Sequence, residues 1–180
     1  MRVHWDQYFM ALAKLAAMRS GCNSRPTEAV IVKGNRVIAT GYNGTIAGMP
    51  QCTDCGSSYC RRREVKQDDK GTGKYLECLS IHGEQNAINQ VAQCGGINLH
   101  WASIYCTLFP CIFCLKNIVS VGIKKIFYEL EYKSDDPERD TYWAGLAKEY
   151  GVILKQVTLS LKNVKAICAN MSNFTSMRRL

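Results

Sequence analysis

The chain has 180 residues, a length typical of one domain with its own core, and a hydrophobic content of 47% that suits a soluble globular protein. No apolar run approaches the roughly 20 residues of a membrane span, and the N-terminus has no signal-type apolar segment. Because ten cysteines in such a chain favour metal binding in a reducing compartment, and a net charge of +8 favours anionic partners, we expect a cytoplasmic protein that binds nucleotides or nucleic acid.

The first part of the chain predicts a helix and then a hairpin. Apolar side chains recur at helical spacing over residues 5–20, at Trp5, Tyr8, Phe9, Leu12, Leu15 and Ala16. Residues 29–33 and 36–41 have the composition of strands and flank a Gly-Asn turn. Residues 45–80 are rich in glycine, cysteine and charge without a period, which predicts a long Cys-rich loop inserted in the domain.

The rest of the chain alternates helices and strands. The pattern predicts helices over 82–93, 111–121 and 141–150, and strands over 102–108, 125–129 and 152–159. We expect the second helix to begin at Pro110, where a missing N–H costs nothing. The alternation predicts an α/β sheet covered by helices on both faces. Residues 1–160 then form the domain, and residues 161–180 form a C-terminal extension, either an extra helix at a subunit contact or a loose end.

Four residues supply the groups of a catalytic zinc site. His82 and Glu84 lie two positions apart, and Cys111 and Cys114 form a C-x-x-C pair after a proline. A structural zinc site closes all four positions with protein ligands, whereas a catalytic site leaves the fourth to water. The pattern is that of the zinc nucleobase deaminases, with one histidine and two cysteines as ligands and an unligated glutamate as general acid and base. A structural zinc knuckle beside an unrelated histidine is the alternative.

Further motifs extend this pattern through most of residues 4–130. They are WD-x-YFM over 5–10, RS-x-C over 19–22, AVIVK over 29–33, ATGYNG over 39–44 and TLFPC over 107–111. On these motifs the chain resembles the deoxycytidylate (dCMP) deaminases. The resemblance implies the three-layer αβα cytidine-deaminase fold around a mixed sheet of about five strands, assembled as a homo-oligomer such as a hexamer or a dimer.

The resemblance also implies a reaction and a binding site. The reaction is the zinc-dependent hydrolysis of dCMP to dUMP and ammonia, which supplies thymidylate synthesis; hydroxide attacks C4 of cytosine while Glu84 shuttles protons. Asn43 would bind the deoxyribose or nucleotide backbone, Arg25 the phosphate, and Phe109 the base. Alternatively, Asn43 serves only the Asn-Gly turn, Arg25 is a solvated surface side chain, and Phe109 packs in the core.

The chain departs from the family at four positions. Gly83 replaces an alanine and keeps its backbone N–H, so the zinc chemistry is expected to survive. Ile46 replaces a proline, Gln51 a histidine and Glu28 a glycine. In the family this region is associated with regulation by dCTP, which activates, and dTTP, which inhibits, together with Mg²⁺. The departures therefore weaken the expectation of that regulation.

Some family members carry a second, structural zinc near the Cys-rich loop. The cysteines that match best are Cys22, Cys52, Cys60 and Cys78, with Cys55 as an alternate. A metal ion bound there would stabilise one conformation of a loop whose amino-acid composition does not predict an ordered structure. The alternative is a set of free or buried thiols.

Two other functions stay open. A deaminase of polymeric nucleic acid, tRNA or DNA, would share the zinc motif, but the WD-x-YFM and GYNG blocks fit mononucleotide enzymes, so nucleic acid is not the expected substrate. A non-catalytic zinc-binding module would use zinc for stability alone. In that module Glu84 would be dispensable.

Overall fold

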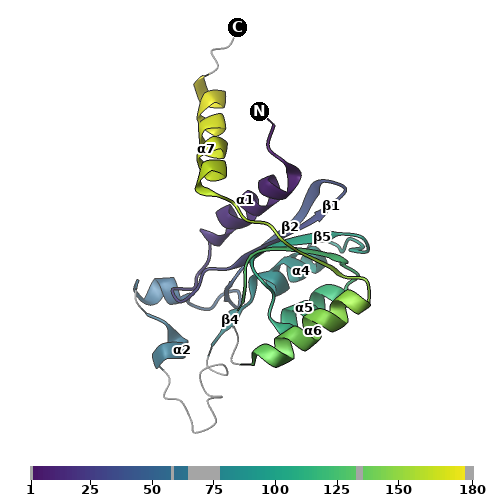
Figure 1. The fold of residues 1–180 in the computed structure, drawn as a ribbon. Helices are drawn as coiled ribbons and strands as arrows, with labels where there is room; N and C mark the ends of the chain where they lie inside the picture. The colour runs from purple at the N-terminus through teal and green to yellow at the C-terminus, as the bar shows by residue number, and fades with distance from the viewer. Residues whose placement is uncertain (1, 58, 65–77, 133–135, 177–180) are drawn as a thin grey trace.

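The computed structural model describes residues 2–57, 59–64, 78–132 and 136–176 (Figure 1). Its helices are α1 (Trp5–Ala17), α2 (Arg61–Glu64), α4 (Gly83–Gln93), α5 (Ile112–Ser120), α6 (Pro137–Glu149) and α7 (Leu161–Ser176), with a 3-10 turn, η1 (Cys52–Cys55). Its strands are β1 (Glu28–Lys33), β2 (Arg36–Tyr42), β3 (Gly44–Thr45), β4 (Ser80–Ile81), β5 (Ser103–Leu108), β6 (Lys125–Leu130) and β7 (Ile153–Gln156).

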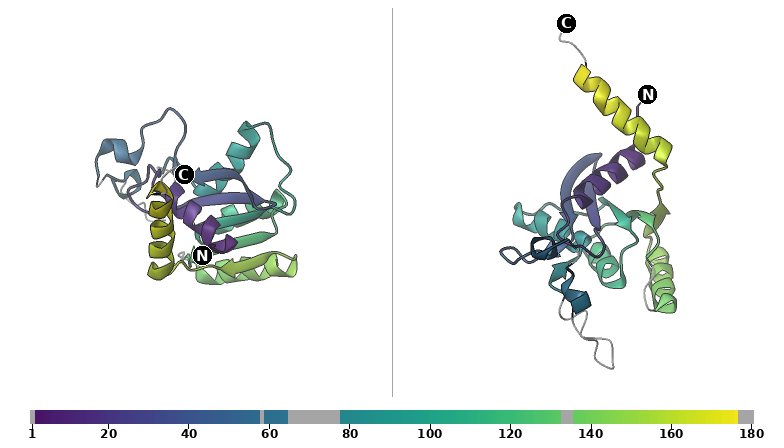
Figure 2. Two further views of the ribbon diagram at one scale, coloured as in Figure 1. Left: turned by 90° about the horizontal axis from the view of Figure 1, so that it is seen from above. Right: turned by 90° about the vertical axis from the view of Figure 1, so that its left-hand side faces the viewer.

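Five strands form one mixed sheet in the order β2-β1-β5-β6-β7. β1 pairs antiparallel with β2 and β5, and β5, β6 and β7 run parallel. α1 covers one face, and α4, α5 and α6 cover the other (Figures 1 and 2). The predicted three-layer α/β fold around a mixed sheet of about five strands is confirmed, as is the hairpin turn, where Gly34 and Asn35 have φ angles of 56° and 58°.

Strand pleating divides the core between the two faces. Ala29 and Ile31 of β1 pack among the helices α4, α5 and α6, whereas Val30 and Val32 pack under α1. Because β1 is buried on both faces of the sheet, its residues 29–32 are all apolar.

The predicted first helix is present, and of the apolar residues that predicted it Phe9 is fully buried. Phe9, Met10 and Ala13 are buried, whereas Trp5 and Tyr8 are about two-fifths exposed. The helix has turned so that Phe9 meets Tyr105 of β5, with ring centroids 5.2 Å apart. Apolar spacing alone did not identify this partner.

Polar contacts tie α1 to strands far along the chain. Asp6 accepts hydrogen bonds from Tyr105 Oη and Lys155 Nζ, both at 2.9 Å, and Lys14 Nζ lies 2.6 Å from Glu129 Oε2. The first helix is thereby joined to the fifth, sixth and seventh strands.

Several predicted boundaries are corrected. The helix predicted over 141–150 begins earlier, at Pro137, because Asp136 caps it by accepting a hydrogen bond from Arg139 N at 3.0 Å. Cys111 is the N-cap of α5, so Pro110 precedes the helix instead of opening it. The last strand is shorter than predicted, and the described parts of the predicted 45–80 loop contain η1, α2 and β4.

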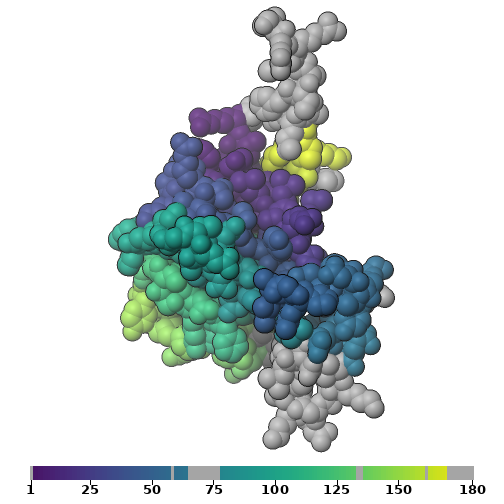
Figure 3. Space-filling model, turned by 180° about the vertical axis from the view of Figure 1, so that it is seen from behind, coloured from purple at the N-terminus to yellow at the C-terminus, as the bar shows by residue number. Residues whose placement is uncertain are grey.

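Two parts project from the layered body. Residues 45–57 and 59–64, here called the lobe, lie beside the body at one end of the sheet (blue in Figure 3). α7 stands away from the sheet beyond α1, and Val164 packs against the cluster under α1 (Figure 2). No helix in the described ranges is both long and apolar enough to cross a membrane.

Candidate functional site

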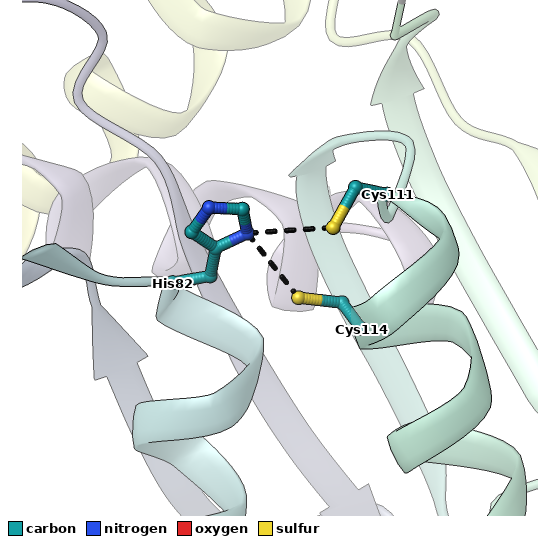
Figure 4. Close-up of side chains that lie close together, drawn as sticks. All are labelled: His82, Cys111 and Cys114. Carbon is teal, nitrogen blue, oxygen red and sulfur yellow. Dashed lines mark hydrogen bonds between the residues drawn. The ribbon is translucent and has the colours of Figure 1, made fainter. Parts of the chain in front are cut away.

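His82, Cys111 and Cys114 meet at the starts of two neighbouring helices (Figure 4). His82 is the N-cap of α4, Cys111 is the N-cap of α5, and Cys114 lies in the first turn of α5. The Nδ1 atom of the histidine lies 3.5 Å from Cys111 Sγ and 3.4 Å from Cys114 Sγ. Within the described ranges, no other group of three or more histidine, cysteine or acidic side chains is as close.

This triad fits a tetrahedral zinc ion. With Zn–N near 2.0–2.1 Å and Zn–S near 2.3 Å, tetrahedral geometry separates nitrogen and sulfur ligands by about 3.5 Å. The nitrogen-to-sulfur distances of 3.4 and 3.5 Å agree with that value. One nitrogen and two sulfurs are also the ligand types that zinc prefers.

The triad's surroundings favour a thiolate. A hydrogen bond with Cys114 lowers the pKa of Cys111, and the same pairing raises the pKa of Cys114. The neighbouring Cys111 raises the pKa of His82, whereas the positive charge of Arg62 opposes that rise. Both helices also direct their N-terminal N–H groups towards this point, which favours negative charge there.

Glu84 lies in the first turn of α4 and faces the same cleft as His82 and Cys111. Only 7% of its surface is exposed. Burial raises the pKa of Glu84 above its usual range, and the His82 charge opposes the rise. A carboxyl in this environment holds a proton more readily than an exposed one, which suits a general acid and base.

α4 is seated on the hairpin by close backbone contact. A Cβ on Gly83 would lie 2.6 Å from Glu28 Cα, and one on Gly41 would lie 2.1 Å from Ala87 N. The helix therefore requires glycine at both positions of the contact. The departure at Gly83 has a local reason, since this chain has no room for the family's alanine.

Two side chains of α4 complete the contact. Asn86 Nδ2 donates to Tyr42 O at 2.8 Å, and Gln90 Oε1 accepts from Thr40 N at 2.8 Å. Both bonds reach the backbone of β2, an edge strand of the sheet. The helix that bears His82 is thus fixed by packing and by hydrogen bonds.

Glu28 is a second buried carboxyl, 1% exposed, and neither of its oxygens has a hydrogen-bond partner. Burial raises the pKa of Glu28 to about 7; the Thr107 hydroxyl and the Lys14 charge oppose the rise, and Glu84 and Glu129 add to it. Glu28 therefore carries the desolvation cost of a buried carboxyl that has no hydrogen-bond partner.

A cleft of about 910 Å³ contains His82, Glu84 and Cys111. Five arginines line it, and Glu84 is its one lining carboxylate among the described residues; the arginines are Arg25, Arg61, Arg62, Arg63 and Arg139. Sequence reasoning selected only the first of these. A cleft with this lining suits an anionic ligand about the size of a nucleotide.

The three predicted substrate residues all line the cleft. Asn43 is buried, and its amide is largely used: Nδ2 donates to Arg25 O at 2.9 Å, and Oδ1 accepts from Thr27 N at 3.0 Å and from the Ser20 hydroxyl. One amide hydrogen is left for a ligand. The exposed Arg25 side chain is available to the cleft.

The aromatic residues at the triad differ in exposure. Phe109 is half-buried and meets Tyr128 edge-on, with centroids 4.9 Å apart. Phe113, between the two cysteine ligands, is 69% exposed and lines the cleft. Sequence reasoning missed Phe113; its position inside the C-x-x-C motif was the available signal.

The cysteines proposed for a second zinc line the same cleft, at its lobe side: Cys22, Cys52, Cys55, Cys60 and Cys78. No three of their Sγ atoms lie within 4.8 Å of one another in the described structure. All ten cysteines of the chain lie in the described ranges, and none forms a disulfide.

Comparison with known proteins places these features in context. Residues 3–130 match the family profile described as "Cytidine and deoxycytidylate deaminase zinc-binding region". Over 157 residues the chain is 40% identical to the deoxycytidylate deaminase of Schizosaccharomyces pombe, and this alignment covers 86% of this chain and 44% of that enzyme. Over 162 residues it is 38% identical to the ComE operon protein 2 of Bacillus subtilis, covering 88% and 74%.

One solved structure with a similar fold contains ligands. It is the dCMP deaminase of cyanophage S-TIM5 in complex with dCMP and dUMP, with a TM-score of 0.64 and 26% identity over 87% of this chain and 99% of that one. The chain spans less than half the length of its fission yeast relative, but nearly the whole length of the phage enzyme.

Proposed function

Because the chain belongs to the cytidine and deoxycytidylate deaminase family, we propose that it hydrolyses dCMP to dUMP and ammonia. One observation carries this proposal: His82 and Cys111 of a zinc-compatible triad, a buried glutamate and several arginines line a single cleft. The triad and glutamate suit deamination of the base, and the arginines suit the phosphate.

His82, Cys111 and Cys114 would hold the zinc ion. When bound to three protein ligands, zinc supplies water activated for attack near neutral pH. The positions of His82 and Cys111 at helix starts support this role, since the N-terminal ends of both helices stabilise the thiolates.

Glu84 carries the protons. It takes one proton from the attacking water as the new C4–O bond forms, and it delivers that proton to N3 of cytosine. It then transfers the second proton of the water to the amine on C4, so that the C4–N bond breaks and ammonia leaves. The burial that raises the pKa of Glu84 supports this double use of one carboxyl.

Arg25 and the arginines of α2 would bind the phosphate, and the remaining amide hydrogen of Asn43 would meet the sugar. Phe109 and the exposed Phe113 would contact the base. Guanidinium groups bind phosphate through paired N–H donors, and an exposed ring beside the metal offers a stacking surface.

A second zinc at the lobe belongs to the same proposal. The presence of Cys22, Cys52, Cys60 and Cys78 in the lining of one cleft supports it, with Cys55 as the alternate. Zinc content per chain is the test. The proposal expects two ions in the natural chain and one in Cys52→Ser; one ion in both would refute it.

We propose that the enzyme is a cytoplasmic homo-oligomer, a hexamer or a dimer. Exposed Trp5 and Tyr8 on α1, with exposed Met18 directly after it, support a subunit contact, and ten free cysteines suit a reducing compartment. Regulation by dCTP and dTTP with Mg²⁺ has less support. Gln51, which replaces the family's histidine, is occupied in holding the lobe, where its Oε1 accepts from Thr45 N at 2.8 Å.

The deciding experiment is ammonia release from dCMP by zinc-loaded protein, with Glu84→Ala alongside and dCTP tested as substrate and as additive. We expect turnover that is lost in the variant while zinc is retained. Turnover of oligonucleotides but not dCMP would establish the polynucleotide alternative, and zinc binding without any turnover would establish a binding module.

A further inference from the structure

The side-chain amide of Asn23 donates to three backbone carbonyls of the lobe. Its nitrogen lies 3.1 Å from Cys52 O, 2.7 Å from Gly56 O and 2.9 Å from Tyr59 O. Two hydrogens on one nitrogen serve three acceptors, so at least one hydrogen is shared. Residues 52–59 are folded around this one side chain.

The lobe has little apolar core that would hold it otherwise. Neither η1 nor α2 buries a residue, and Cys60 is the one buried side chain among the described residues from 52 to 64. Ordering such a segment costs conformational entropy that burial does not offset here. Hydrogen bonds from neighbouring polar side chains therefore help to fix its position, together with the second zinc ion proposed above.

α2 follows these carbonyls directly. One residue, Cys60, separates Tyr59 from the first arginine of α2, and the three arginines of α2 line the cleft with His82. Arg63 Nη2 also lies 3.3 Å from the hydroxyl of Ser24, the residue after Asn23. Two adjacent residues thus hold both ends of this short helix.

The segment that carries Asn23 is itself fixed to the sheet. Gly21 N donates to Asn43 O at 3.2 Å, and the Asn43 side chain bonds the backbone of Arg25 and Thr27 immediately before β1. The sheet therefore sets the position of Asn23 relative to the triad. Through its three hydrogen bonds, Asn23 in turn sets the position of the lobe.

We propose that Asn23 is a positioning residue for substrate recognition, which seats residues 52–59 so that α2 presents its arginines to the phosphate of the nucleotide. The inference rests on the proposed function, because it takes an anionic substrate in this cleft as given. Asn23 does not line the cleft. It therefore acts on substrate binding and leaves the deamination step unchanged.

The decisive variants are Asn23→Asp and Asn23→Ala, with Asn98→Ala as the matched control. Aspartate keeps the shape of asparagine but has only acceptors, so it faces three carbonyl oxygens without a hydrogen. Asn98 bonds a backbone N–H through its side chain in a loop outside the cleft. If Asn23 acts as a donor, aspartate is at least as damaging as alanine.

We expect the KM for dCMP to rise about tenfold in Asn23→Ala and further in Asn23→Asp, the scale of one lost hydrogen-bonding group. We expect kcat and zinc content to stay near those of the natural chain. Activity on deoxycytidine, which lacks the phosphate, should change little. A natural KM in Asn23→Asp, or equal losses on dCMP and deoxycytidine, would overturn the proposal.

A second measurement separates this inference from the proposed function. Hydrogen exchange of the 52–64 peptide reports the seating of the lobe without any turnover. If the natural chain fails to deaminate dCMP, the proposed function fails. Faster exchange in Asn23→Asp and slow exchange in Asn98→Ala would still support the seating, and unchanged exchange in all three proteins would refute it.

Discussion

The zinc triad (Figure 4) and the lobe (Figure 3) both contribute residues to the same cleft, but they are held in place in different ways. The triad lies at the starts of two helices that pack on the sheet. The lobe depends on side-chain hydrogen bonds, chiefly from Asn23 and Gln51. The groups proposed for chemistry are therefore positioned by core packing. The groups proposed for phosphate recognition depend on a few side-chain hydrogen bonds, which single substitutions can remove.

The largest expected effect is on the catalytic side, in Glu84→Gln. The amide keeps the shape of the carboxyl but cannot carry protons, so we expect kcat on dCMP to fall by about 10²–10⁴-fold while zinc stays bound. Glu138, which also lies in the first turn of a helix, supplies the control Glu138→Gln. Steady-state kinetics with metal analysis decides; a kcat within tenfold of the natural chain would remove Glu84 from the mechanism.

The next effect tests the backbone contact that seats α4. A methyl group at position 41 would lie 2.1 Å from Ala87 N, which is backbone and cannot move aside, so Gly41→Ala should cost about 3 kcal/mol of stability and weaken zinc binding. Gly145 in α6 has open space around it, and Gly145→Ala should stabilise by about 0.5–1 kcal/mol. Thermal unfolding compares the two. Equal stability of both variants would mean that α4 is not fixed by this contact.

The buried Glu28 makes stability depend on pH. Its pKa rises from 4.5 to about 7 on folding, so the folded state binds the proton more tightly and stability falls as pH rises through that window. Glu28→Gln removes the loss, which is at most roughly 3 kcal/mol above pH 7. Unfolding midpoints should therefore favour the variant at pH 8 and agree near pH 4.5. A difference that is the same at both pH values would contradict the buried-carboxyl explanation.

The smallest effect is expected in the lobe, in Gln51→Ala. The variant loses the hydrogen bond to Thr45 N and leaves space beside Gly21 and Gly44. We expect a cost of about 1 kcal/mol confined to the lobe, seen as a KM for dCMP raised a few-fold with little change in the unfolding midpoint. Gln93→Ala at the exposed end of α4 is the control. A large drop in the unfolding midpoint would show that the lobe is part of the main cooperative unit.

The catalytic side of this comparison was largely predictable from the sequence. His82, Glu84, Cys111 and Cys114 carry their chemistry in their residue types and spacing, and the predicted helices place them at helix starts. The strands of the sheet were also predicted, because a continuous apolar run such as β1 between two turns has few other uses.

The lobe was much less predictable. Asn23 bonds backbone carbonyls 29 to 36 positions further along the chain, and Gln51 bonds a backbone N–H in an irregular loop. The spacing of residues in the sequence does not indicate contacts of this kind. The arginines of α2 and Phe113 were missed for a related reason, since only the folded chain brings α2 to the cleft. The apolar spacing of α1 did not identify its partner Tyr105, because that residue lies almost a hundred positions further along the chain.

The contacts of α1 have a consequence for synthesis. Asp6 meets Lys155 across 149 positions, and Lys14 meets Glu129 across 115. α1 also packs on β1 and, through Phe9 and Tyr105, on β5, so part of its apolar face can be covered once β5 has been synthesised, whereas its ion pairs form only after β6 and β7. A nascent chain that pauses before residue 103 therefore lacks Tyr105 and leaves Phe9 of α1 partly uncovered, and at that stage we expect it to be most dependent on chaperones.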